Sequence, residues 1–164
     1  MTIINTSKGL RLLNAPIHTK SSEMNVRYTT SIENINWKDV SDIFKAVGWG
    51  ERLSQQVKFS FERSSFKRFA YVSDELVGVG RTVDDGYYYG WIVDLAVLPK
   101  YQRNGIGSKI LSELENDLKP FLTTMLTAAP GKNGFYEKLG WHKQCSAYIW
   151  PRSEEQIRSF SLNG

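Results

Sequence analysis

The fold is restricted most strongly by an apolar segment that stops at a proline and leads through a glycine-containing loop into an amphipathic helix. Tyr87–Leu98 combines aromatic and β-branched residues and predicts a long strand that Pro99 ends. Apolar residues recur at helical spacing in Ile106–Leu118, which predicts a helix with one buried face. The polar residues 100–107 must therefore lie at a strand-to-helix junction.

The remaining elements indicate a sheet with helices on both faces. Asn36 is a good helix N-cap, and the apolar residues after it recur at helical spacing. Strand and helix patterns alternate only in the second half of the chain, which argues against a doubly wound parallel sheet and for a mixed α/β sheet. In chain order we also predict strands or helices at Val26–Ser31 (strand), Trp37–Val47 and Leu53–Arg63 (helices), Phe66–Ser73 and Leu76–Val83 (strands), Phe121–Ala128 (strand), Pro130–Leu139 (short helix) and Trp141–Trp150 (last strand).

Length and composition fit one globular domain. The chain has 164 residues, of which 41% are hydrophobic and 23% charged, and this composition excludes an intrinsically disordered chain. Residues 1–25 contain no aromatic residue and predict an N-terminal extension, either lying on the surface or used for targeting, before a single domain over 26–164. The sequence has one cysteine, Cys145, which excludes an intramolecular disulfide and fits a reducing, cytoplasmic compartment.

Charge and residue spacing exclude several classes of partner. The net charge of +4 suits a small polyanion but is too low for the clustered basic surface of a nucleic-acid-binding protein. No apolar run approaches the roughly 18 residues of a membrane-spanning helix. His18 and His142 lie far apart, and with one cysteine they form no metal-binding pattern. We therefore expect no nucleic acid, no membrane and no metal.

The loop at the junction is suited to a phosphate or pyrophosphate. It contains the run Gln102-Arg103-Asn104-Gly105-Ile106-Gly107. At such a junction the helix N-terminus presents unpaired N–H groups and a partial positive charge, and glycines allow a ligand to approach the backbone closely. The run lacks the third glycine of a dinucleotide-binding loop and the Gly-Lys-Ser/Thr of a P-loop. On the pattern alone, a glycine-bearing turn without a ligand remains an alternative.

Two motifs in the chain resemble those of the GCN5-related N-acetyltransferase (GNAT) family. Val93–Gly107 resembles the family's motif A, in which an apolar strand and a proline precede Q/R-x-x-G-x-G/A at the start of a helix. Further along, Gly134–Trp141 is similar to the family's F/L-Y-x-x-x-G-F/W motif. The resemblance covers residues 26–150 and implies a mainly antiparallel central sheet, flanked by helices and splayed at its central strands.

The resemblance also implies acetyl-CoA as co-substrate. By motif position, the loop Gln102–Gly107 and Ser108 would bind the pyrophosphate, largely through backbone N–H groups. Leu95, Ala96 and Val97 would pair with the pantetheine arm as if it were an added strand. Asn133 precedes Tyr136 by three residues and could reach an amide of the arm, although the family's more distant asparagine is replaced by Ala129.

The resemblance places Tyr136 at the family's general-acid position. A phenol can donate a proton to the thiolate that leaves when the thioester is cleaved. The alternative is a core tyrosine with a structural role.

Asp94 is the candidate base or amine anchor. It is a single carboxylate in the otherwise apolar stretch Trp91–Leu98, where an unpaired charge would be costly. The alternative, which the sequence leaves equally open, is an ion pair with Arg81 on a neighbouring strand.

The acceptor is expected to lie between the loop after the first helix and the long strand. Trp49 and Glu51 belong to the loop, and Tyr89 and Trp91 share one face of the strand. An aromatic wall with nearby negative charge suits an amine through cation–π contacts. Each of these residues also has an ordinary structural explanation.

Together these features predict an enzyme that transfers an acetyl group from acetyl-CoA to the primary amine of a small molecule, by direct attack in a ternary complex. Two alternatives remain open, namely a peptide or protein N-acetyltransferase and a non-catalytic acyl-CoA-binding regulator. Relatives in this family often dimerise, so the resemblance also allows a homodimer.

Overall fold

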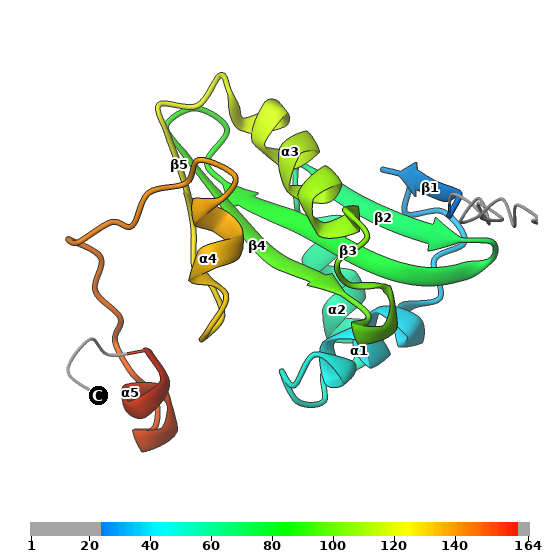
Figure 1. Ribbon diagram of the computed structural model, residues 1–164, viewed down its shortest axis with the longest axis horizontal. Helices are drawn as coiled ribbons and strands as arrows, with labels where there is room; N and C mark the ends of the chain where they lie inside the picture. Colours follow the sequence, from blue (N-terminus) through cyan, green and yellow to red (C-terminus); the bar gives the residue numbers. More distant parts are fainter. Residues whose placement is uncertain (1–23, 161–164) are drawn as a thin grey trace, which may run out of the picture.

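The computed structural model describes residues 24–160, in which a five-stranded sheet is covered by helices on both faces (Figure 1). The predicted extension 1–25 lies outside the described residues except for its last two. The elements follow the order β1 (Val26–Thr29), α1 (Trp37–Ala46), α2 (Ser54–Glu62), β2 (Lys67–Val72), β3 (Glu75–Asp84), β4 (Tyr89–Val97), a 3₁₀ turn (Pro99–Tyr101), α3 (Ile106–Leu118), β5 (Thr123–Leu126), α4 (Asn133–Glu137) and α5 (Glu154–Phe160).

The sheet is mixed, as the sequence predicts. Its strands lie in the order β1-β2-β3-β4-β5, with antiparallel pairing except between β4 and β5, which are parallel. The strand β4 is therefore second from one edge, and the short strand β5 forms that edge. The crossover from β4 to β5 passes through α3, as parallel neighbours require.

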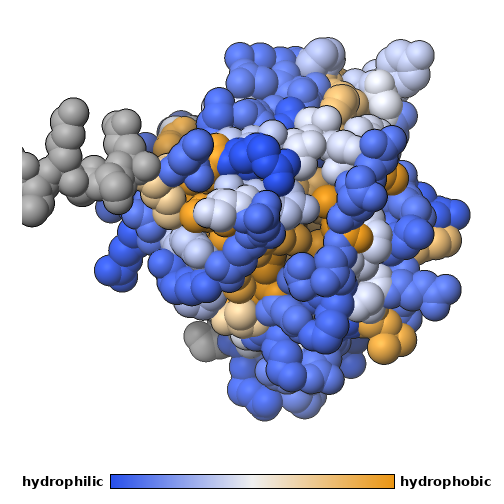
Figure 2. All heavy atoms as spheres, turned by 90° about the vertical axis from the view of Figure 1, so that its right-hand side faces the viewer, coloured by the Kyte–Doolittle hydropathy of each residue, from blue (hydrophilic) through white to orange (hydrophobic). Residues whose placement is uncertain are grey.

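Two apolar clusters fix the helices to the two faces of the sheet. On one face α1 and α2 pack through residues such as Phe44 and Phe61 against Phe69 and Val79 of the sheet. On the other face α3 buries Ile106, Ile110, Leu111, Leu114 and Leu118 against β2, β3 and β4. The side view in Figure 2 shows apolar side chains in a central area framed by hydrophilic ones. None of the helices among residues 24–160 is long and apolar enough to span a membrane.

Most helix ends follow from local sequence. The Asn36 side chain accepts a hydrogen bond from the Lys38 N–H and caps α1, as predicted. Gly105 has φ +79° at the N-cap of α3, a conformation that glycine adopts without strain. The helix α3 spans the predicted range Ile106–Leu118.

The prediction of a last strand over Trp141–Trp150 is wrong. The segment forms no strand, and the side chains of Tyr148 and Trp150 are 98% and 82% exposed. Its aromatic and branched residues favour extended backbone, but a strand also needs a hydrogen-bonded partner, and the segment pairs with no described strand. The helix α5 follows it and lies apart from the sheet in Figure 1.

Candidate active site

A bulge in β4 determines where the candidate site lies. Val79 pairs with Ala96 and Arg81 with Val93, so Asp94 and Leu95 lie opposite the single residue between Val79 and Arg81. Asp94 has φ +52°, in the left-handed region that non-glycine residues rarely adopt. The extra residue reverses the alternation of faces, so that Leu95 packs in the cluster of α3 while Asp94 contacts the side of α1 and α2.

The bulge also marks the point where β4 loses one of its two neighbours. The strand β5 pairs with Tyr89–Ile92 only, so the stretch Val93–Val97 has no strand partner on that side among the described residues. The sheet is thus splayed as expected, but among the described residues the splay lies between β4 and the edge strand β5 rather than at the central strands. The predicted pantetheine-binding residues Leu95, Ala96 and Val97 lie in this unpaired stretch. Ala96 and Val97 stay paired with β3 on the other side, whereas Leu95 belongs to the bulge.

The glycine loop is held in shape by its own side chains. The Gln102 side chain donates a hydrogen bond of 2.9 Å to the Val97 carbonyl, and the Asn104 side chain donates to the carbonyls of Tyr101 and Gln102. Arg103 has φ +66°. The two polar side chains that flank Arg103 therefore stabilise the turn and leave ligand binding to the backbone.

The N-terminus of α3 presents unpaired donors at the end of this loop. No side chain caps the helix, and the first intrahelical hydrogen bond runs from the Lys109 N–H to the Gly105 carbonyl. The N–H groups of Ile106, Gly107 and Ser108 are consequently available. A Cβ built on Gly105 would meet nothing within 4 Å, so the space in front of the backbone is open. This arrangement fits a phosphate group.

The helix α4 brings Phe135 against the start of α3, and Tyr136 follows Phe135 in the same helix. A Cβ built on Gly107 would lie 3.6 Å from both Phe135 Cζ and Val97 Cγ2, so α4, the start of α3 and the end of β4 meet there. Tyr136 packs edge-on against Phe135, with ring centroids 4.9 Å apart. Burial raises the pKa of the Tyr136 hydroxyl from its ordinary value of 10.0, which keeps it protonated at neutral pH. Asn133 lies exposed at the first position of α4.

Asp94 is held between two arginines. Arg81 donates from Nε to one carboxylate oxygen at 2.6 Å, which is the ion pair that the sequence left open. Arg52 donates from Nη1 to the other oxygen at 2.9 Å. The Arg52 side chain is 38% exposed, against 16% for Arg81, so Arg52 is the outer partner of the carboxylate.

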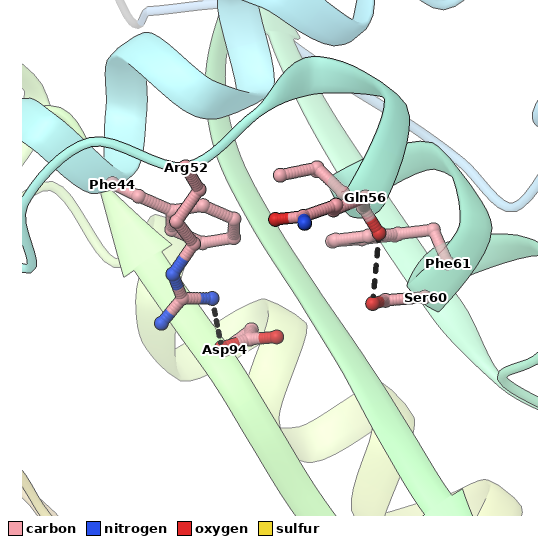
Figure 3. Close-up of a pocket in the computed structure, with 7 residues that line it drawn as sticks. Phe44, Arg52, Gln56, Ser60, Phe61 and Asp94 are labelled. Carbon is pink, nitrogen blue, oxygen red and sulfur yellow. Dashed lines mark hydrogen bonds and ion pairs between the residues drawn. The ribbon is translucent and has the colours of Figure 1, made fainter.

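A small pocket opens beside Asp94, between α2 and the bulge (Figure 3). Its volume is about 160 Å³. The guanidinium of Arg52 lies 4.4 Å from the centroid of the Phe44 ring, which forms part of the wall. The residues that line the pocket are Phe44, Arg52, Gln56, Val57, Ser60, Phe61 and Asp94.

The predicted acceptor residues divide between this pocket and other places. Trp49 stacks on Phe44 at 5.5 Å, behind the wall of the pocket. Glu51 forms an ion pair with Lys45 and faces a second, polar cavity of about 350 Å³. Tyr89 and Trp91 lie exposed on the paired stretch of β4 and do not line the pocket. The structure thus brings Trp49 near Asp94 and leaves the other three apart from the pocket.

Sequence reasoning missed Arg52, Gln56 and Ser60 as pocket residues. Arg52 lies in the loop that was already singled out for Trp49 and Glu51. A lone carboxylate in an apolar strand calls for a cationic partner, and that rule could have directed attention to both arginines rather than to Arg81 alone. Among residues 24–160, no three His, Cys, Asp or Glu side chains gather in a way that could hold a metal ion.

Comparisons with known proteins agree with this geometry. Residues 65–143 match the acetyltransferase (GNAT) domain family. The chain is 31% identical over 124 residues to an uncharacterized N-acetyltransferase, ycf52, of Pyropia yezoensis, covering 71% of this chain and 70% of the relative. It is also 30% identical to a GNAT family acetyltransferase of known structure from Streptococcus pneumoniae, with a TM-score of 0.64, covering 79% of this chain and 98% of that one.

A third comparison concerns the fold. The structure of an aminoglycoside 6'-N-acetyltransferase complexed with coenzyme A superposes with a TM-score of 0.61 at 18% identity, covering 70% of this chain and 83% of that one. The motifs, the splayed sheet and the relatives lead to one assignment: the chain belongs to the GNAT family of N-acetyltransferases.

Proposed function

We propose that the protein transfers an acetyl group from acetyl-CoA to the primary amine of a small molecule, by direct attack in a ternary complex. The observation that carries the proposal is the meeting of three features at one place, namely the unpaired stretch of β4, the free N–H groups at the start of α3, and Tyr136 on α4. Residues 26–164 would form the whole catalytic domain.

The residues at this place fit the proposed co-substrate. The N–H groups of Ile106–Ser108 would bind the pyrophosphate, with Arg103 and Lys109 adding positive charge. The edge of Leu95–Val97 would hydrogen-bond to the pantetheine arm, and Asn133 would bind one of its amides. The bound co-substrate supplies an activated acetyl group as a thioester. The likeness to a fold solved with coenzyme A supports this use of the site.

Three groups of the chain would assist the transfer. A backbone N–H near Leu95 would stabilise negative charge on the acetyl oxygen. Tyr136 would donate its proton to the leaving sulfur, a role that its raised pKa supports. Asp94 or water would accept the proton of the amine. Both oxygens of Asp94 are engaged by arginines, so the amine would compete with Arg52, the more exposed partner, for the carboxylate.

The size of the pocket beside Asp94 favours a small acceptor. A volume of about 160 Å³ holds a group of a few heavy atoms. A peptide acceptor is the second candidate, because the polar cavity of about 350 Å³ shares Arg52 and Gln56 with the pocket and would lengthen it.

The test is a panel of small amines and short peptides, with release of free thiol from acetyl-CoA as the readout. We expect turnover with small amines. In Tyr136→Phe we expect acetyl-CoA to bind and turnover to fall by about 10²–10⁴-fold. If the wild-type protein binds acetyl-CoA but acetylates no member of the panel, it acts as a non-catalytic acyl-CoA-binding regulator. If peptides are the better acceptors, the small-molecule assignment is wrong and the peptide candidate replaces it.

A further inference from the structure

Two of the residues that line the pocket beside Asp94 are charged, namely Arg52 and Asp94, and they form an ion pair with each other. Arg52 comes from the loop between α1 and α2, and Asp94 comes from the bulge of β4, 42 residues away in the chain. Figure 3 shows the guanidinium reaching down from that loop to the carboxylate across the open side of the pocket. Among residues 24–160, this is the one ion pair that connects the loop between α1 and α2 with β4.

The two partners are held very differently. Asp94 is 12% exposed and keeps its second oxygen on Arg81, which is itself fixed by a hydrogen bond to the Ser64 hydroxyl. Arg52 is more exposed, and its remaining guanidinium donors bond to no described residue. Its loop contains Gly48 and Gly50, both with positive φ. Glycines give the backbone of this loop more conformational freedom than other residues would. Arg52 is thus the less constrained partner: apart from Asp94 it contacts the Phe44 and Trp49 rings, at 4.4 and 5.6 Å from their centroids, whereas Asp94 is also held by Arg81.

Further hydrogen-bonding capacity faces the pocket. The side-chain amide of Gln56 bonds to no described residue, and Gln56 lines the same pocket as Arg52 (Figure 3). A guanidinium with free donors next to a free amide forms a good site for a carboxylate. Phe44 and Phe61 supply the apolar part of the wall.

We propose that the acceptor is zwitterionic, a primary amine that also carries a carboxylate, and that it exchanges partners with the Arg52–Asp94 pair. This inference rests on the proposed acetyl transfer to a small amine. The ammonium of the acceptor replaces Arg52 at Asp94, and its carboxylate replaces Asp94 at Arg52 and Gln56. Both charges keep a partner throughout, and the cost avoided is larger for Asp94, which is 12% exposed, than for the more exposed Arg52. An acceptor with an ammonium group alone would leave Arg52 without its anion.

The test compares amino acids with their carboxamides. Glycine, β-alanine, γ-aminobutyrate and phenylalanine are each paired with the amide that lacks the negative charge. The proteins are the wild type, Arg52→Gln, Arg52→Lys and the control Arg63→Gln, which removes an exposed arginine at the end of α2 outside the pocket. Calorimetry on protein saturated with free CoA gives binding without reaction, and thiol release gives kcat/KM.

We expect the wild type to prefer at least one amino acid over its amide by about tenfold to a hundredfold, the usual effect of a hydrogen bond to a charged group. Arg52→Gln should abolish that preference, Arg52→Lys should keep part of it, and Arg63→Gln should leave it unchanged. The amide also alters the basicity of the amine. The decisive quantity is therefore the affinity, or kcat/KM, for the amino acid divided by that for its amide, compared between each variant and the wild type.

Two results would overturn the inference: no amino acid bound better than its amide, or a preference that survives in Arg52→Gln. If the wild type binds neither the amino acid nor the amide of any pair, that result also overturns the inference. If the amino acids bind selectively but none is acetylated, the proposed acetyl transfer fails while the zwitterion site stands. If amides and amino acids are acetylated equally, the transfer stands and the zwitterion site fails.

Discussion

The two halves of β4 belong to one strand but have very different surroundings. Tyr89–Ile92 is paired on both sides, and Gly90 and Ile92 are buried under α3. Val93–Val97 is paired on one side, contains the bulge and is followed by the glycine loop. The first half holds the sheet together, and the second half leaves the backbone groups on one side without a strand partner among the described residues.

The comparison shows how one strand can serve stability and chemistry together. In the paired half, a Cβ on Gly90 would lie 2.5 Å from Leu118 Cδ2, so the packing leaves no spare room. Next to the open half, at the start of α3, a Cβ on Gly107 would meet its nearest atoms at 3.6 Å. The bulge lies in β4 just after the tightly packed half, and it turns Asp94 toward the pocket.

The largest effect is expected from Tyr136→Phe, which removes the hydroxyl of the proposed general acid on α4. Turnover should fall by about 10²–10⁴-fold while acetyl-CoA binds as in the wild type, because only the hydroxyl is lost. Steady-state thiol release together with calorimetry separates the two quantities. Since burial raises the pKa of Tyr136 above 10.0, its ionisation should not lower activity anywhere in the neutral range. Unchanged turnover in the variant would remove Tyr136 from the mechanism.

A smaller effect, on stability, is expected from Gly90→Ala in the paired half. The new methyl group would overlap the side chain of Leu118, which is fully buried and would have to shift within the core, so the free energy of unfolding should fall by about 1–3 kcal/mol. Gly107→Ala is the matched control, because its methyl group has room, and its effect should stay below about 1 kcal/mol. Chemical denaturation measures both. Equal losses in the two variants would mean that the halves are packed alike.

The smallest effect is expected on the stability at acid pH, through the ion pairs that attach α3 to β2 away from the glycine loop. Arg68 on β2 binds Glu113 and Asp117 of α3 at 2.7 and 2.6 Å. Burial opposes ionisation of Glu113, but hydrogen bonds from Arg68 and Lys109 outweigh it and lower the pKa of Glu113 below its ordinary 4.5. A lowered folded-state pKa stabilises the protein above the unfolded value, and this stabilisation is lost as the pH falls through the folded value.

Glu113→Gln should therefore flatten the loss of stability below about pH 4.5, by about 1 kcal/mol or less. Denaturation midpoints across the acid range measure this, with Glu115→Gln, an exposed position on the same helix, as control. An identical acid response in Glu113→Gln and the wild type would show that this ion pair contributes nothing to the attachment.

Local patterns were enough to predict most of the fold. The spacing of apolar residues predicted α1 and α3, Asn36 predicted the start of α1, and the glycines predicted the loop before α3. These features depend on residues close in sequence, so the sequence contains their causes. The capping pair Ser153 and Gln156, in which the Gln156 N–H donates to the Ser153 hydroxyl, would also have indicated α5, but it was overlooked.

The features that create the site depend on distant residues. The bulge at Asp94 exists only in the register against β3, and the open edge of β4 exists because β5 is short. The Arg52–Asp94 pair joins a helix loop to a central strand. The wrong prediction at Trp141–Trp150 has the same origin, since residue type favours a strand there and only the tertiary structure decides whether a partner is present.

The central claim is that the open half of β4 and the glycine loop bind acetyl-CoA, and calorimetric titration tests it most directly. The proteins are the wild type, Gly107→Glu, which places a negative charge among the free N–H groups, and Ser112→Glu, which adds the same charge on the exposed side of α3. We predict binding by the wild type and Ser112→Glu, and none by Gly107→Glu. Acetyl-CoA at 100 times its Kd should also stabilise the two binding proteins by about 2.7 kcal/mol. Absence of binding in the wild type, or equal binding in Gly107→Glu, would contradict the account.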